Sequence, residues 1–152
     1  MQMKKSLKIL VPIDFSKHSL ETLRFALTLR DYFDPTFFLL YVVVDGEFEY
    51  FTQMSGTPRE EQRRQMQAAL SQLEQEAQRI REIVPDARVE ATVLTGTPFK
   101  EICRYAEQQS VQLIVIGTHG RTGLSHLLIG STAERVVQQA SCPVLSVKPS
   151  IL

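Results

Sequence analysis

Short apolar runs alternate with longer amphipathic stretches along this chain. Continuous runs rich in valine, isoleucine and leucine are typical of strands that are buried on both faces of a parallel sheet. We expect such strands at residues 8–13, 37–44, 111–116 and 143–148. Residues 89–93 instead alternate apolar and polar side chains, which predicts a strand at or near an edge of the sheet.

Two helices are expected in the first half of the chain. Ser16 can cap the first of them, and Asp34-Pro35 is expected to end it. Its apolar stripe consists of Leu20, Leu23 and Leu27. Residues 58–84 predict a long amphipathic helix. Its apolar stripe consists of Met66, Leu70, Leu73, Ala77 and Ile80. This second stripe is short enough to favour packing on a sheet over a coiled coil.

Two shorter helices are expected in the second half. Thr97-Pro98 places a proline at the first helical position. The core side of that helix consists of Phe99, Ile102 and Ala106. The segment 131–134, Ser-Thr-Ala-Glu, matches a capping box, so a helix should start at Ser131 and carry Val136 and Val137 inward. Strands that alternate with helices in this way predict a parallel α/β sheet with crossover connections.

Composition narrows the class of protein. We expect a single domain over residues 1–152, because a chain of 152 residues with 43% hydrophobic residues can form one two-sided core. The 17 basic residues balance the 17 acidic ones, so no general positive field draws the protein to nucleic acid or to an anionic membrane. The apolar runs fall short of the ~20 residues that a membrane helix needs, and a cytoplasmic location is therefore expected.

The cysteines and histidines do not suggest a metal centre. Cys103 and Cys142 lie in predicted helical surroundings without the close pairing of a redox or metal motif, so we interpret them as reduced, packed thiols. Three histidines are too scattered to complete a zinc site with them. We expect His18 to face solvent on the first helix and His126 to have a packing or surface role.

A glycine-rich segment follows the fourth expected strand. Gly117 and Gly120 precede a spacer that ends at Gly130, Ser131 and Thr132. Glycines allow backbone N–H groups to approach an anion, and the start of a helix adds unpaired N–H groups and a positive dipole end. These features predict a phosphate site. They are equally compatible with a glycine turn followed by a serine-capped helix, and the segment is neither a P-loop nor a G-x-G-x-x-G motif.

The spacing G-x₂-G-x₉-G-S resembles that of the universal stress protein family, specifically its ATP-binding branch. It comprises Gly117, Gly120, Gly130 and Ser131. The opening segment 9–16, Ile-Leu-Val-Pro-Ile-Asp-Phe-Ser, and the closing segment 142–147, Cys-Pro-Val-Leu-Ser-Val, extend the similarity to most of the chain. The resemblance implies an open five-stranded parallel sheet in the order 3-2-1-4-5 with helices on both faces, which is a Rossmann-like adenine-nucleotide-binding fold.

The resemblance also implies where a nucleotide binds. ATP would lie at the carboxyl edge of the sheet, where the strand order reverses. Asp14 is expected near the ribose or near an accompanying Mg²⁺ or Mn²⁺ ion, and the backbone of Val42 near the adenine. His119 and Arg121 flank the phosphate segment and could add charge. The full set of expected nucleotide-binding residues is Pro12, Ile13, Asp14, Val42, Gly117, Thr118, His119, Gly120, Arg121, Gly130, Ser131 and Thr132.

The function that this resemblance implies is that of an ATP-dependent stress-response regulator. The family further implies a homodimer paired through the last strand, and a protein partner is left open. We assign no catalytic residue, because the segment offers backbone amides and no evident base beyond His119, so at most slow ATP hydrolysis is expected. Two alternatives remain: a weak ATPase or self-phosphorylating protein, and a dimeric adaptor that binds no nucleotide.

Overall fold

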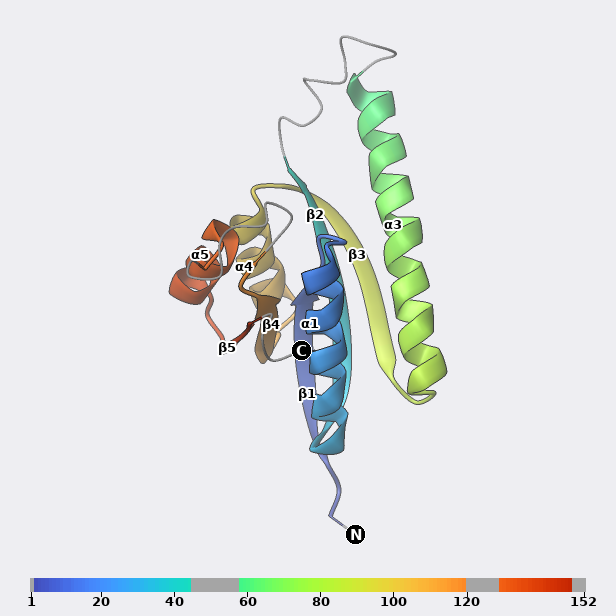
Figure 1. Ribbon diagram of the computed structural model, residues 1–152, viewed down its shortest axis with the longest axis vertical. Helices are drawn as coiled ribbons and strands as arrows, with labels where there is room; N and C mark the ends of the chain where they lie inside the picture. The colour runs from blue at the N-terminus through green and yellow to red at the C-terminus, as the bar shows by residue number, and fades with distance from the viewer. Residues whose placement is uncertain (1, 45–57, 120–128, 149–152) are drawn as a thin grey trace.

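The computed structural model describes residues 2–44, 58–119 and 129–148. Its five strands form one parallel sheet in the order β3-β2-β1-β4-β5, which confirms the expected fold class (Figure 1). The strands are β1 (Lys5–Pro12), β2 (Phe33–Val44), β3 (Arg88–Gly96), β4 (Leu113–Gly117) and β5 (Val144–Val147). The helices are α1 (Lys17–Leu27), the 3₁₀ turn η1 (Thr28–Asp31), α3 (Pro58–Ile83), α4 (Pro98–Gln108) and α5 (Ser131–Gln139). Residues 45–57, between β2 and α3, lie outside the described residues.

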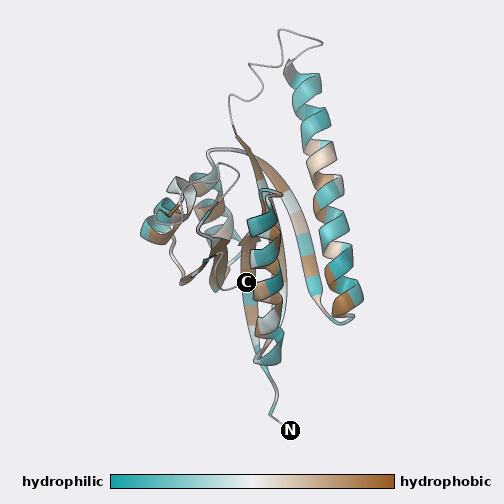
Figure 2. Cartoon of the chain, viewed as in Figure 1, coloured by the Kyte–Doolittle hydropathy of each residue, from teal (hydrophilic) through white to brown (hydrophobic). Residues whose placement is uncertain are grey.

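Helices cover both faces of the sheet, because successive residues of a strand point to opposite sides. In β1, Ile9 and Val11 belong to one buried cluster, whereas Leu10 belongs to the other. The first cluster includes buried side chains of α1 and α3, and the second includes those of α4 and α5. Figure 2 shows the consequence: the strands are largely hydrophobic, and α3 is mostly hydrophilic with interrupted apolar positions.

The expected end of the first helix at Asp34-Pro35 is wrong. Helix α1 ends at Leu27, and Pro35 lies inside β2, opposite Leu7 of β1. Proline fits there because β3 begins to pair with β2 only at Thr36, so the N–H group that Pro35 lacks has no ladder partner on that side. Proline also favours extended backbone at the preceding residue, which suits the start of a strand.

Two expected core positions on the helices are also wrong. Leu70 of α3 is 40% exposed, and the neighbouring Ala69 is buried in its place. Leu73, Ala77 and Ile80 are buried as expected, so the true stripe differs from the expected one only in the first half of the helix. In α5, Val136 is fully buried, whereas Val137 is 51% exposed because adjacent helical residues point about 100° apart.

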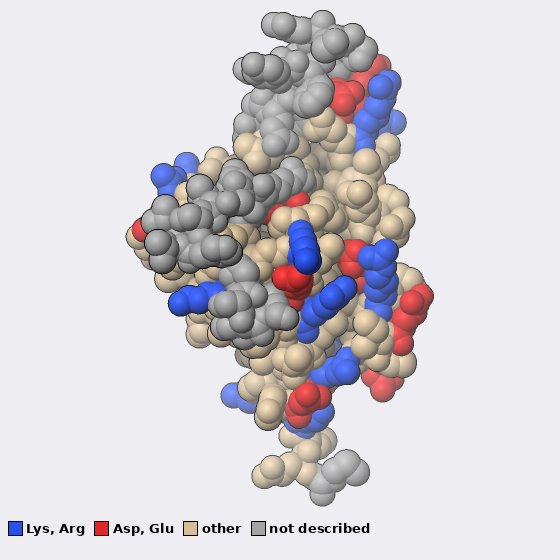
Figure 3. Space-filling view, in the orientation of Figure 1, with Lys and Arg blue, Asp and Glu red and all other residues tan. Residues whose placement is uncertain are grey.

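The surface carries no large field of one sign on the face that Figure 3 displays. Lysine and arginine side chains are interspersed there with aspartate and glutamate side chains. Within residues 2–44, 58–119 and 129–148, no helix has the length and apolar character that crossing a membrane requires.

Candidate functional site

The turn between β1 and α1 is held by local hydrogen bonds. The carboxylate of Asp14 accepts from the backbone N–H of Ser16 at 2.9 Å. The hydroxyl of Ser16 accepts from the N–H of Ser19 at 3.1 Å, which confirms Ser16 as the N-cap of α1. Asp14 therefore has a structural role in the turn as well as a position at the carboxyl end of β1.

Phe15 adopts a backbone conformation that is uncommon for its residue type. Its φ is 63°, in the left-handed region that costs a side-chain-bearing residue roughly 1–2 kcal/mol. Its ring packs against that of Tyr41 with the centroids 5.0 Å apart, and both contact the core on the α1 side of the sheet. This contact helps to hold the turn that carries Asp14. No sequence signal revealed it, because phenylalanine is not a typical residue for such a turn.

The end of β4 connects two neighbouring elements through Thr118. Its backbone N–H donates to the carbonyl of Val147 at the end of β5 (3.1 Å), and its carbonyl accepts from the N–H of Gly130 before α5 (2.6 Å). Thr118 is 2% exposed, so this junction is buried. The start of α5 is thereby positioned directly by the end of β4.

A side chain at Gly117 and a side chain at Gly130 would meet different neighbours. A Cβ atom on Gly117 would lie 2.8 Å from ring atoms of His18 and 2.9 Å from the hydroxyl of Thr22, so Gly117 makes room for α1. The expectation that His18 faces solvent is wrong, because its ring lies against this strand end. A Cβ atom on Gly130 would lie 3.2 Å from the carbonyl oxygen of Thr118, and its φ of −59° imposes no requirement for glycine.

Helix α5 begins at Ser131 as expected, but the capping box is wrong. The N-cap is Gly130, and no side chain caps the helix. A capping box would require Ser131 to be the N-cap. Ser131 is instead the first helical residue, one position after the N-cap. Because the first-turn N–H groups of a helix have no carbonyl partner within it, this uncapped N-terminus is suited to an anion.

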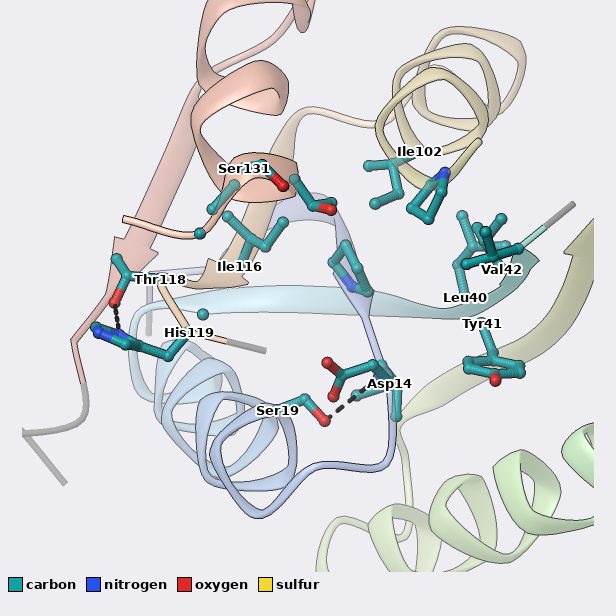
Figure 4. A pocket seen from close by; sticks show the side chains of 18 residues that line it. Asp14, Ser19, Leu40, Tyr41, Val42, Ile102, Ile116, Thr118, His119 and Ser131 are labelled. Atoms are coloured by element: carbon teal, nitrogen blue, oxygen red, sulfur yellow. Dashed lines mark hydrogen bonds between the residues drawn. The ribbon is translucent and has the colours of Figure 1, made fainter. Parts of the chain in front are cut away.

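These elements surround a cavity of about 300 Å³ at the carboxyl edge of the sheet, at the lower end of the roughly 300–1,000 Å³ typical of small-molecule sites. Figure 4 shows Leu40, Val42 and Ile102 on one side of it and Ser131, Thr118 and His119 on another. The apolar wall comprises Pro12, Ile13, Leu40, Val42, Val44, Pro98, Ile102, Ile116 and Ala133. The other wall residues are Asp14, Ser19, Tyr41, Gly117, Thr118, His119, Gly130, Ser131 and Thr132.

The structure brings together all the expected binding residues that it describes. Those that line the cavity are Pro12, Ile13, Asp14, Val42, Gly117, Thr118, His119, Gly130, Ser131 and Thr132. Gly120 and Arg121 lie outside the described residues. Sequence reasoning missed Pro98 and Ile102, which it treated only as a helix start and a core position. Their place directly after the carboxyl end of the edge strand β3 was the available signal, because the first turns of the helix that follows a parallel strand lie at that edge of the sheet.

The two cysteines lie beside the second core rather than in the cavity wall. Both are free thiols, and burial raises the pKa of each above its usual range. Cys142 lies between α5 and β5, so its expected helical surroundings are wrong. No three His, Cys, Asp or Glu side chains gather as a metal-binding group in the part of the chain that the structure describes.

Comparison with known proteins gives consistent matches over nearly the whole chain. The model of the universal stress protein family matches residues 6–148. Universal stress protein MJ0531 of Methanocaldococcus jannaschii is 36% identical over 144 residues, which cover 93% of this chain and 81% of that protein.

Solved structures share the same fold. The structure of MJ0577, a universal stress protein from the same organism, is 28% identical, has a TM-score of 0.77, and the match covers 97% of both chains. A universal stress protein family protein from Arabidopsis thaliana, solved with AMP bound, is 21% identical with a TM-score of 0.60 and covers 93% of this chain and 91% of its own.

Proposed function

The chain belongs to the universal stress protein family, and on that premise we propose that it binds ATP and acts as a cytoplasmic, nucleotide-dependent regulator. The observation that carries this proposal is the cavity at the carboxyl edge of the sheet, which joins an apolar slot to an uncapped helix N-terminus. An adenine nucleotide has the matching chemistry, because its base is flat and largely apolar and its phosphates are anionic.

The apolar half of the cavity suits the adenine. Val42 of β2 and Ile102 of α4 face the cavity from two neighbouring elements, and Pro98 adds a rigid apolar surface at the start of α4 (Figure 4). When a flat ring binds between such side chains, both of its faces are removed from contact with water. This burial is favourable by roughly 25 cal/mol for each Å² of apolar area buried. Backbone groups near Val42 would then select the edge of the base.

The opposite half suits the phosphates. Gly130, Ser131 and Thr132 present the N-terminus of α5 to the cavity, where backbone N–H groups and the helix dipole favour an anion. No lysine or arginine is among the described residues that line the cavity. A triphosphate would therefore need further compensation, and we propose that Mg²⁺ or Mn²⁺ accompanies ATP near Asp14, with the phosphates supplying most of its ligands.

The AMP-bound structural neighbour supports this assignment, because a protein with the same fold binds an adenine nucleotide. The test is isothermal titration calorimetry of nucleotide-free protein with ATP, AMP, adenosine and GTP in the presence of Mg²⁺. We expect ATP to bind and GTP to bind at least about tenfold more weakly. Absence of ATP binding would overturn the proposal and would favour a dimeric adaptor without nucleotide.

We propose that turnover is slow at most. A hydrolase needs a group that positions water, and the candidate in the cavity wall is His119, whose Nδ1 lies 2.8 Å from the hydroxyl of Thr118. Incubation with γ-labelled ATP separates three outcomes. Stable bound ATP supports a regulator, whereas released phosphate would identify an ATPase and label on Ser131 or Thr132 would identify self-phosphorylation.

We further propose a homodimer formed through β5. Among the described strands it is at the edge of the sheet and pairs with β4 alone, so its outer side presents backbone N–H and carbonyl groups. Val144 and Leu145 are only partly buried there. Sedimentation equilibrium should give twice the chain mass at micromolar concentration, and a monomer throughout that range would contradict the proposal.

A further inference from the structure

His18 occupies the back of the strand end that forms the phosphate side of the cavity. Its Nε2 lies 3.0 Å from the carbonyl oxygen of Val147, and a carbonyl accepts but does not donate, so Nε2 carries the proton. The ring also covers Gly117 so closely that a Cβ atom there would lie 2.8 Å from two of its atoms. The side chain of His18 therefore connects helix α1 to the ends of both β4 and β5.

The carbonyl of Val147 is shared with Thr118. It accepts the backbone N–H of Thr118 at 3.1 Å, and the Thr118 hydroxyl lies 3.4 Å away. The N–H of His18 is thus a further donor on this oxygen. Thr118 in turn accepts from Gly130 through its own carbonyl, at 2.6 Å. A chain of hydrogen bonds runs from His18 through Val147 and Thr118 to the start of α5.

His18 also contacts His119, a residue of the cavity wall. Their rings meet edge to face, with centroids 5.9 Å apart and an angle of 75° between the planes. The Nδ1 of His119 lies 2.8 Å from the hydroxyl of Thr118. The ring of His119 therefore has two contacts that hold it, one with the Thr118 hydroxyl and one with the ring of His18.

The second nitrogen of His18 restricts its chemical state. Nδ1 is buried and has no hydrogen-bond partner among the residues that the structure describes. A proton there would be a buried donor without an acceptor, which is costly. A proton on Nε2 fits both observations, because the bond to the Val147 carbonyl requires a donor there and Nδ1 has no acceptor among the described residues.

From this geometry we infer that His18 is a positioning residue for the phosphate half of the cavity. His18 does not itself line the cavity. It contacts His119 directly and Thr118 through the shared carbonyl of Val147, and both of these residues line the cavity. Through Thr118 it also supports Gly130. The inference rests on the proposed nucleotide-binding function. It adds a residue that the glycine motif does not contain and predicts a selective effect on phosphate binding.

Three variants test the inference. His18→Leu removes the donor to Val147 and the edge contact to His119. His18→Gln can place an N–H group near the position of Nε2 and should restore the bond. Thr22→Val is the matched control, because the Thr22 hydroxyl faces the same Gly117 but donates only to the His18 carbonyl within α1.

The measurements are calorimetric titrations with ATP and adenosine, together with nitrogen NMR of the histidine rings. We expect His18→Leu to weaken ATP binding about three- to tenfold, the size of one neutral hydrogen bond, and to leave adenosine binding within about twofold. His18→Gln and Thr22→Val should bind ATP nearly as the wild type does. The wild-type ring should show Nε2 protonated and Nδ1 bare.

Each other result overturns a specific statement. Wild-type protein that binds neither ligand removes the proposed function and the inference with it. Wild-type binding with an unchanged His18→Leu variant, or with equal losses for ATP and adenosine, leaves the proposed function standing and overturns the positioning role. If His18→Leu does not fold, His18→Gln decides in its place: an Nδ1-protonated wild-type ring or weak ATP binding by this variant refutes the inference.

Discussion

Replacement of Gly130 by alanine isolates the phosphate side of the cavity from the stability of the fold. The backbone at this residue has φ −59° and ψ 148°, which alanine adopts without strain. The added Cβ atom would lie 3.2 Å from the carbonyl of Thr118, which is tight enough to require a shift of a few tenths of an ångström. Thr118 is buried and bonded to Val147, so the start of α5 has to move instead.

The two consequences of Gly130→Ala differ in size. The free energy of unfolding should change by less than about 1 kcal/mol, because the tight contact opposes the lower chain entropy of unfolded alanine. Misaligned N–H groups at the α5 N-terminus should lose about one hydrogen bond to a charged phosphate, worth roughly 1.5–3 kcal/mol. ATP binding should therefore weaken about 10- to 100-fold.

Calorimetry with ATP and adenosine, combined with urea unfolding, measures both quantities. Adenosine should bind Gly130→Ala as it binds the wild type, because it lacks the phosphates. Val137→Ala is the control on the same helix, since Val137 is 51% exposed and lies outside the cavity wall. Wild-type ATP affinity in a folded Gly130→Ala protein would refute the assignment of the α5 N-terminus to phosphate.

Three further predictions concern the stability of the fold. Gly117→Ala should lower the free energy of unfolding by about 1–3 kcal/mol because its Cβ atom overlaps His18; an unchanged urea midpoint would contradict the packing. Ser16→Ala should cost about 1 kcal/mol of stability through the lost cap of α1, with Ser71→Ala, an exposed serine on α3, as the neutral control in thermal unfolding. Burial raises the pKa of the Cys103 thiol, so the folded state retains a proton that the unfolded state loses, and stability should fall as the pH rises above about 8.5. Cys103→Ala should flatten this alkaline decrease in the urea midpoint, and an equal slope in both proteins would refute it.

Local patterns were sufficient to predict the presence and type of the five strands and the main helices, but not where each begins and ends. The run at 37–44 and the stripe at 73–80 are strongly periodic, and both became the expected elements. Asp34-Pro35 misled because a proline is compatible with a strand wherever its missing N–H has no partner, and that depends on where β3 begins to pair. Val137 misled because adjacent helical residues point in different directions, so only one of the valine pair could be buried.

The candidate site was predictable where its residues follow the carboxyl ends of strands. Asp14, Val42 and Gly117 meet because parallel strands place those ends at one edge. His18 was not predictable, since its partner Val147 is 129 residues away in the sequence. The packing role of Gly117 was likewise not predictable. The spacing motif suggested that its backbone approaches a ligand, whereas the structure shows that α1 approaches it closely.

The most direct test of the proposed nucleotide site is a backbone amide NMR titration of nucleotide-free protein with ATP and Mg²⁺. The account predicts that Val42 at the apolar half and Gly130, Ser131 and Thr132 at the α5 N-terminus shift together with one dissociation constant. Leu73 in the middle of α3, on the far face of the sheet, should not move. Shifts confined to other residues, or none at saturating ATP, would contradict the account.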